Sequence, residues 1–189
     1  LIDACENPKV FKFLHIPVQS GDDRILEAMN REYESKDYFE IVEKFRKNFP
    51  DMTISTDIIA GYPGDDEESF EKTKYLLERS RPDIVNITRF SPRQYTPDFG
   101  KKTPVSNLIK RWSQEYTEIH HRIIREKYES LRGIEEKIMI TEWGKNMTSV
   151  GRDMSYRPVV IPGRMDKYSW VKVRIIGSGG TYLIGESVD

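Results

Sequence analysis

The first half of the chain alternates short apolar runs with segments whose apolar residues recur at helical spacing. Three runs have the length and character of buried strands: residues 11–18, 52–60 and 83–90. Three segments have the spacing of amphipathic helices: residues 23–30, 37–48 and 67–79. Strands that alternate with helices indicate a parallel α/β sheet. Three such units are too few to close a barrel by themselves.

Acidic residues mark the beginnings of two of these helices. Asp22 or Asp23 is expected to cap the first helix, and Asp65 the third, with Glu68 at capping-box spacing behind it. A much longer helix is predicted to begin at Thr103, because Thr is a good N-cap and a proline follows it. Its apolar stripe runs over residues 105–131 and packs on the α/β part.

The pattern changes after Gly133, which is a natural end for the long helix. Five short strand-like segments follow, with glycine, proline or asparagine turns between them: residues 137–143, 148–152, 158–161, 170–176 and 181–187. Five short strands in this space predict a small OB-like barrel. We therefore expect two domains, residues 1–133 and residues 134–189.

Composition narrows the class of protein. Hydrophobic residues make up 37% and charged residues 32%, and no apolar run is long enough for a membrane span. The single cysteine, Cys5, excludes an internal disulfide, suits a reducing cytoplasm and cannot hold an iron–sulfur cluster alone. Residues 105–189 are mildly basic, with 14 Lys and Arg against 11 Asp and Glu, which permits nucleic-acid binding. The start at Leu1 and the incomplete α/β part suggest a piece of a longer protein.

Three motifs occur in order, at residues 14–31, 56–64 and 90–93, and the third continues into the loop 91–97. Together they resemble the radical S-adenosylmethionine (SAM) methylthiotransferases, which add a methylthio group to tRNA adenosines or to a ribosomal protein. The resemblance implies the C-terminal part of a radical SAM (β/α) partial TIM barrel. Residues 134–189 resemble the five-stranded TRAM β-barrel, a module that binds RNA. The Cys-x-x-x-Cys-x-x-Cys motif of the family is not present in this sequence.

The resemblance also implies a cofactor site for SAM. It assigns six residues to that site: Gln19, Ser20, Arg31, Asp57, Ile59 and Gly61. Arg31 would clamp the α-carboxylate and Asp57 would accept hydrogen bonds from the hydroxyls or the ammonium, while backbone near Gly61 would pass along the adenine. Taken singly, Arg31 could instead pair with Glu27, and His15 reads as a satisfied core histidine.

Further residues are candidates for contact with RNA. Arg93 follows the third strand, in a loop where either substrate contact or a rigid turn would explain it, and Tyr95 there replaces the glycine usual in the family. In the barrel, cations and aromatic residues alternate, a mixture that can neutralise phosphates and stack on unpaired bases. These candidates are Arg152, Tyr156, Arg157, Arg164 and Lys167.

The function implied by the resemblance is methylthiolation of C2 of N6-threonylcarbamoyladenosine at position 37, with the tRNA anticodon stem-loop as partner. The parent protein would bind two [4Fe–4S] clusters through N-terminal domains outside this chain. Its cluster cysteines would therefore lie outside these 189 residues, its catalytic residues are not identified, and the chain alone would be inactive. Three alternatives remain: an isopentenyl-adenosine tRNA methylthiotransferase, a ribosomal-protein aspartate methylthiotransferase, and a non-catalytic RNA-binding module. We expect no membrane association and predict no particular oligomeric state.

Overall fold

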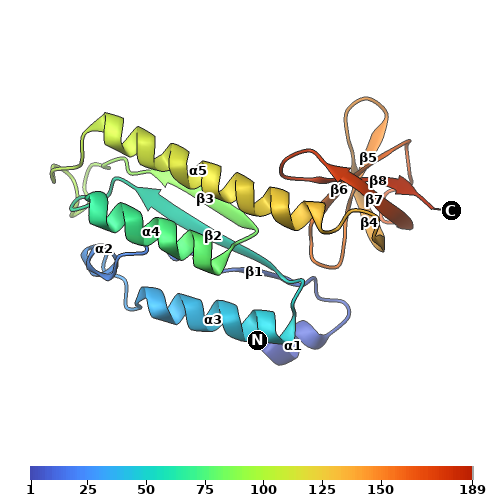
Figure 1. The fold of residues 1–189 in the computed structure, drawn as a ribbon, viewed down its shortest axis with the longest axis horizontal. Coiled ribbons are helices and arrows are strands. Elements are labelled where there is room, and N and C mark those ends of the chain that lie inside the picture. The colour runs from blue at the N-terminus through green and yellow to red at the C-terminus, as the bar shows by residue number, and fades with distance from the viewer. Residues whose placement is uncertain (189) are drawn as a thin grey trace. The chain divides into compact units, whose positions relative to one another are not determined.

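The chain divides into two compact units, shown in a computed structural model that describes residues 1–188 (Figure 1). One, here called the sheet unit, comprises Leu14–Pro50 and Ile54–His120. The other, the barrel unit, contains Leu1–Phe13, Asp51–Thr53 and the residues from His121 onward. The predicted domain boundary between residues 133 and 134 stays a prediction.

The sheet has three strands in the order β1-β2-β3, which are Phe13–His15, Thr53–Ala60 and Ile84–Arg89. Strands β2 and β3 run parallel, with Asp57 opposite Asn86. The extended path of β1 continues to Gln19, which forms an isolated parallel bridge with Ile58. The predicted parallel α/β sheet is confirmed, although the first strand is shorter than its apolar run.

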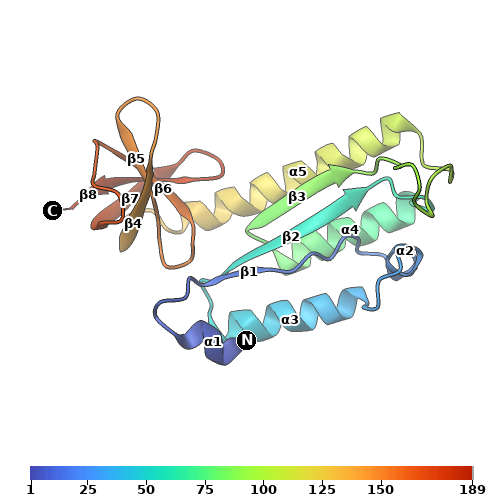
Figure 2. The ribbon, with the colours of Figure 1, turned by 180° about the vertical axis from the view of Figure 1, so that it is seen from behind.

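One face of this sheet is covered and the other is open. Figure 2 shows the strands on the near side, with α4 (Glu67–Ser80) behind them. Side chains of β2 alternate accordingly: Ile54 and Ile58 are fully buried, while Asp57 on the opposite face is partly exposed. The remaining helices of the chain are α1 (Ile2–Glu6), α2 (Asp23–Ala28), α3 (Ser35–Asn48) and α5 (Ser106–Glu129).

The predicted cap of α2 and the predicted start of α4 at Glu67 are confirmed, but the predicted cap of α4 and the predicted start of α5 are wrong. Asp22 caps α2 and accepts a hydrogen bond from the Arg24 backbone at 2.9 Å. Helix α4 is capped by Asp66, because the carboxylate of Asp65 turns back to accept the backbone N–H groups of the preceding turn. Helix α5 begins at Ser106, two residues after the proline that was expected to open it.

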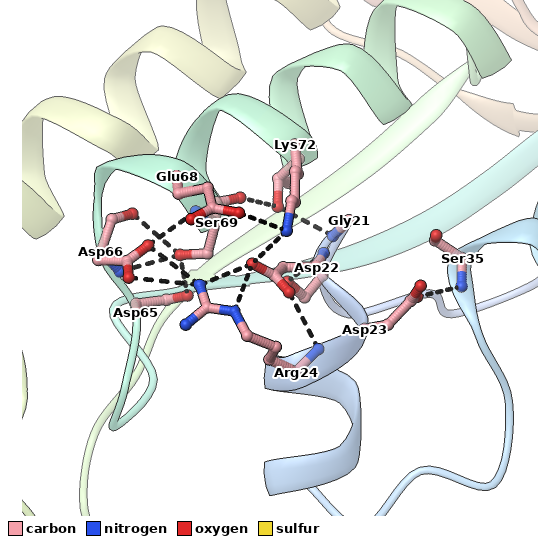
Figure 3. A network of polar contacts seen from close by, with 12 residues as sticks. Gly21, Asp22, Asp23, Arg24, Ser35, Asp65, Asp66, Glu68, Ser69 and Lys72 are labelled. Carbon is pink, nitrogen blue, oxygen red and sulfur yellow. Dashed lines mark hydrogen bonds and ion pairs between the residues drawn. The ribbon is translucent and has the colours of Figure 1, made fainter.

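A network of charged side chains joins the beginnings of α2 and α4 (Figure 3). Asp22 is 1% exposed and lies 2.9 Å from the Arg24 guanidinium and 3.3 Å from Nζ of Lys72. Arg24 also reaches Asp66 at 3.3 Å. Burial raises the pKa of the Asp22 carboxyl, but the hydrogen bonds from Arg24 and Lys72 outweigh it and the net pKa is lowered. The network therefore fixes the turn that follows β1.

The barrel unit contains the five predicted strands. They form a closed barrel in the order β4-β5-β6-β8-β7, and their bounds are Glu135–Trp143, Thr148–Arg152, Pro158–Pro162, Trp170–Ser178 and Leu183–Ser187. Ile124 and Tyr128, from the last turns of α5, pack into its core. The inward side chains of the strands are Ile138, Ile140, Val159, Ile161, Val173, Ile175 and Leu183. This confirms the small five-stranded barrel.

Candidate functional site

A row of hydrogen-bonded polar side chains crosses the open face of the sheet. Asp57 Oδ2 lies 3.2 Å from Nε2 of His15, and Asp57 Oδ1 accepts a hydrogen bond of 2.8 Å from the Asn86 side chain. The other ring nitrogen of His15 lies 2.9 Å from Oγ of Ser55. The Asp57 side chain is 31% exposed, so it is held in place and still open to a ligand. Sequence reasoning treated His15 as a core residue and missed this pairing.

The turn after β1 is fixed against the carboxyl end of β2. The backbone N–H of Gln19 donates to Asp57 O at 2.8 Å, and the Ile59 N–H donates to Gln19 O at 2.9 Å. Gln19 has a φ of +72°, a left-handed conformation that is unusual for a residue with a side chain. Ser20 is buried and its hydroxyl accepts the Asp22 N–H. Gln19 and Ile59 are thus brought side by side, as parallel strand ends predict.

Gly61 has a backbone conformation and a close neighbour that a residue with a side chain would not tolerate. Its φ is +83°, and a Cβ at this position would lie 2.5 Å from the Ile109 side chain. Its N–H donates to the Asp65 carboxylate at 2.8 Å. Because Asp65 is partly buried, its pKa is raised, although the hydrogen bonds it accepts from Ser69 and the turn backbone act in the other direction. The backbone beside the end of β2 is therefore fixed.

A hollow of about 280 Å³ lies at the carboxyl ends of β2 and β3. Its lining residues are Ile59, Thr88, Arg89, Phe90, Ser91, Arg93, Thr96 and Asp98. Tyr95 lies in the same loop, is fully exposed and has a φ of +67°. It thus adopts the left-handed backbone that favours glycine, so its substitution for glycine does not abolish that local conformation.

Arg31 is not brought into this hollow. It lines a separate polar hollow of about 620 Å³ beside α2 and the start of α3, together with Glu27, Tyr33 and other charged residues. Its backbone N–H ends the turn of α2 by donating to Leu26 O at 2.9 Å. The carboxylate clamp assigned to Arg31 therefore stays a prediction.

An exposed tryptophan forms the centre of a cationic patch on the barrel. Trp143 is 55% exposed, with Nζ of Lys167 4.6 Å and Cζ of Arg164 5.3 Å from its ring centroid. Its indole N–H donates to Met165 O at 3.0 Å, which fixes the ring. Sequence reasoning named the two cations but missed Trp143; its place at the end of a strand, directly before a Gly-Lys-Asn turn, was the available signal.

A second cation–aromatic pair is formed by Arg152 and Tyr156. Cζ of Arg152 lies 4.8 Å from the Tyr156 ring centroid, and its guanidinium donates to Tyr156 O at 3.2 Å. The tyrosine ring makes edge contacts with Phe11 and Phe13 at centroid distances of 5.1 and 5.4 Å. Tyr156 keeps 40% of its surface exposed, which leaves the pair accessible.

Arg157 has a different environment from the other barrel cations. Its side chain is mostly buried, with an ion pair to Asp153 and another to Glu136 at 3.4 Å. Asp153 also accepts the Arg157 backbone N–H at 2.8 Å. A guanidinium held by two carboxylates is poorly placed to neutralise a phosphate, so we leave Arg157 out of the RNA contacts proposed below.

The sequence of this chain is similar to the sequences of known proteins. Residues 2–77 match the model of the Radical SAM superfamily. A probable threonylcarbamoyladenosine tRNA methylthiotransferase of Archaeoglobus fulgidus is 43% identical over 98% of this chain and 43% of its own length. The protein of the same name from Pyrococcus horikoshii is 38% identical over 100% of this chain and 44% of its own.

The chain belongs to the radical SAM methylthiotransferase family. It spans less than half the length of these relatives. A tRNA-2-methylthio-N(6)-dimethylallyladenosine synthase of Thermotoga petrophila is 33% identical over 93% of the chain and covers 41% of that protein. Relatives named for threonylcarbamoyladenosine and a relative named for dimethylallyladenosine therefore both match nearly the whole chain. The threonylcarbamoyladenosine relatives named above have the higher identities.

The residues present fit one family cofactor and not the other. Asp57 offers a partly exposed, oriented carboxylate to a ligand ammonium or hydroxyl, and Arg93 adds a cation at the neighbouring hollow, which suits SAM. An iron–sulfur cluster needs about three or four thiolates, whereas this sequence has Cys5 alone and it is buried. Among residues 1–188 no group of three or more His, Cys, Asp or Glu could hold a metal ion, and no helix could cross a membrane.

Proposed function

We propose that the protein containing this chain is a tRNA methylthiotransferase that modifies C2 of N6-threonylcarbamoyladenosine at position 37. The observation that carries the proposal is 43% identity, over 98% of the chain, to a relative named for this activity. The polar row on the open sheet face supports it, because a held but accessible carboxylate suits a cationic cofactor. Since tRNA is the proposed substrate, we also propose a cytoplasmic location.

The sheet unit would bind and orient SAM. Asp57 would accept hydrogen bonds from the SAM ammonium or ribose hydroxyls, and His15 and Asn86 would hold its two oxygens in position. The backbone of Ile59 and the turn at Gly61 would approach the adenine. When bound, SAM supplies the methyl group and the radical chemistry of the family. Segments outside this chain would hold the two [4Fe–4S] clusters.

The other residues assigned to SAM have supporting roles in this proposal. Gln19 and Ser20 lie on the turn that is fixed to β2 by backbone hydrogen bonds and to the Asp22 network by the Ser20 hydroxyl. They would position polar groups beside Asp57. Arg31, in its separate hollow, would reach the SAM carboxylate only if its exposed side chain extended toward Asp57.

The barrel unit would bind the anticodon stem-loop. Trp143 with its two cations and Tyr156 with Arg152 offer aromatic surface next to positive charge, and this combination recognises unpaired bases and phosphates. Such a loop presents both. Arg93, at the rim of the hollow on the sheet unit, would contact the substrate near the cofactor.

The experiment that tests the proposal uses the full-length protein, anaerobically reconstituted with iron and sulfide and given SAM, reductant and tRNA. Mass spectrometry of digested nucleosides should show the methylthio derivative of threonylcarbamoyladenosine. Appearance of only the isopentenyl-adenosine product would reassign the substrate. If a ribosomal-protein aspartate were modified and the tRNA were not, the proposal would be overturned. The 189-residue chain assayed alone should be inactive and colourless, because it has one cysteine.

A further inference from the structure

A hollow in the barrel unit, apart from the aromatic patches, carries positive charge that the proposed function has not used. It has a volume of about 380 Å³ and is lined by His121, Arg125, Ser178 and Gly180. The first two residues come from α5, Ser178 is the last residue of β7, and Gly180 lies in the turn between β7 and β8. Two segments far apart in sequence thus form one small concave surface.

The helix contributes a cation without a partner. His121 and Arg125 are four residues apart, so their side chains lie on one face of α5. Arg125 is exposed, and within residues 1–188 it makes neither a hydrogen bond nor an ion pair. Arg132, three residues beyond the end of this helix, is instead paired with Glu129 at 3.5 Å. Arg125 is therefore available to an external anion, whereas Arg132 is already neutralised.

The glycine-rich turn opposite the helix is built to expose its backbone. Gly180 has a φ of +87°, and a Cβ there or at Gly177 would meet no atom within 4 Å. Gly179 is required by packing, since its Cβ would overlap the ring of Tyr182. Its N–H donates to Tyr182 O at 2.9 Å and holds the turn closed. The turn thus presents the Ser178 hydroxyl and bare backbone beside Arg125 without bulky side chains in the way.

We propose that this hollow binds a backbone phosphate of the tRNA, an inference that rests on the proposed function of tRNA binding. A guanidinium can donate two hydrogen bonds to one phosphate, and hydroxyl and backbone N–H groups are frequent phosphate donors that position a nucleic acid without reading its sequence. RNA is favoured over an acidic protein surface because the same barrel carries exposed aromatic rings beside cations at Trp143 and Tyr156. The site would fix the orientation of the barrel on the RNA.

The test measures binding of the 189-residue chain to a fluorescently labelled anticodon stem-loop over a series of salt concentrations. Arg125→Ala should lower affinity about three- to tenfold at low salt and make the log–log salt slope less steep by about one unit. Arg132→Ala is the control: it removes the same charge from the turn just after the helix, but a charge that Glu129 already neutralises. It should leave the slope unchanged. Both residues are exposed, and circular dichroism spectra equal to the wild-type spectrum are required to show that the variants fold.

The outcomes separate the phosphate site from the proposed function. If the wild-type chain binds the RNA and Arg125→Ala keeps its affinity and slope, the phosphate site is refuted while tRNA binding stands. If the wild-type chain binds no RNA at low salt, the phosphate site and the proposed binding of the stem-loop by the barrel unit are both refuted, whereas the proposed activity is still decided by the full-length assay. Binding of inorganic phosphate to the chain, measured by calorimetry, distinguishes an RNA phosphate from a free anion as the ligand. Submillimolar binding of phosphate that is lost in Arg125→Ala, with RNA binding unaffected, would show a free-anion site and overturn the assignment to RNA.

Discussion

Replacing Glu136 by glutamine should flatten the pH dependence of stability of the barrel unit. The Glu136 side chain is 17% exposed, and its Oε1 is buried with no hydrogen-bond partner within residues 1–188. Burial and the nearby negative charge of Asp153 raise its pKa to about 7, against the opposing attraction of Arg157. A carboxyl group with these neighbours is ionised at a cost in the folded protein.

The sign and size follow from linkage. The folded-state pKa of Glu136 lies above its ordinary value of 4.5, so the folded state binds the proton more tightly than the unfolded state. Its contribution to stability is fully present below pH 4.5 and is lost as pH rises through 7. At about 1.4 kcal/mol per pH unit the difference has an upper limit of roughly 3.5 kcal/mol. Because the Arg157 guanidinium 3.4 Å away attracts the ionised Glu136 carboxylate and offsets part of the penalty, we expect about 1–2 kcal/mol.

Urea unfolding of the chain at pH 5, 6, 7 and 8, followed by tryptophan fluorescence, measures this effect. The wild-type free energy of unfolding should fall across the range more than that of Glu136→Gln, and the two should converge or cross by pH 8. Glu135→Gln is the matched control, because hydrogen bonds from Lys172 and Arg174 lower the pKa of Glu135. The contribution of Glu135 to the free energy of unfolding therefore changes with pH only below pH 5. Parallel curves for wild type and Glu136→Gln would refute the reasoning.

Three further predictions concern the candidate sites. Gly61→Ala should destabilise the chain by about 2–3 kcal/mol in urea unfolding, because φ is +83° and Ile109 occupies the space; a loss under 0.5 kcal/mol would contradict this. In the full-length protein, Asp57→Asn should weaken SAM binding about ten- to a hundredfold in calorimetry, whereas the exposed Asp3→Asn should not; equal affinities would make Asp57 structural. Trp143→Ala should weaken stem-loop RNA binding about five- to a hundredfold, and unchanged affinity would remove the tryptophan patch from the interface.

The order of the elements could be predicted from the sequence alone. Strands and helices in the first half differ so clearly in apolar period that their types and sequence followed from it, and the glycine-punctuated segments after residue 133 indicated the barrel. Family motifs at residues 56–64 identified Asp57 as a candidate ligand. These features are local in the chain, so a linear reading captures them.

The partners of individual side chains were decided only by the tertiary structure. His15 and Asn86 meet Asp57 because three strands align in one register, and Arg125 meets the β7–β8 turn because the barrel closes. Arg157 reads like any other exposed cation in the sequence, yet the fold encloses it between two carboxylates. Hydrogen bonds and charge neutralisation act over a few ångströms in space. Residues that are tens of positions apart in the chain therefore reveal their roles only after folding brings them together.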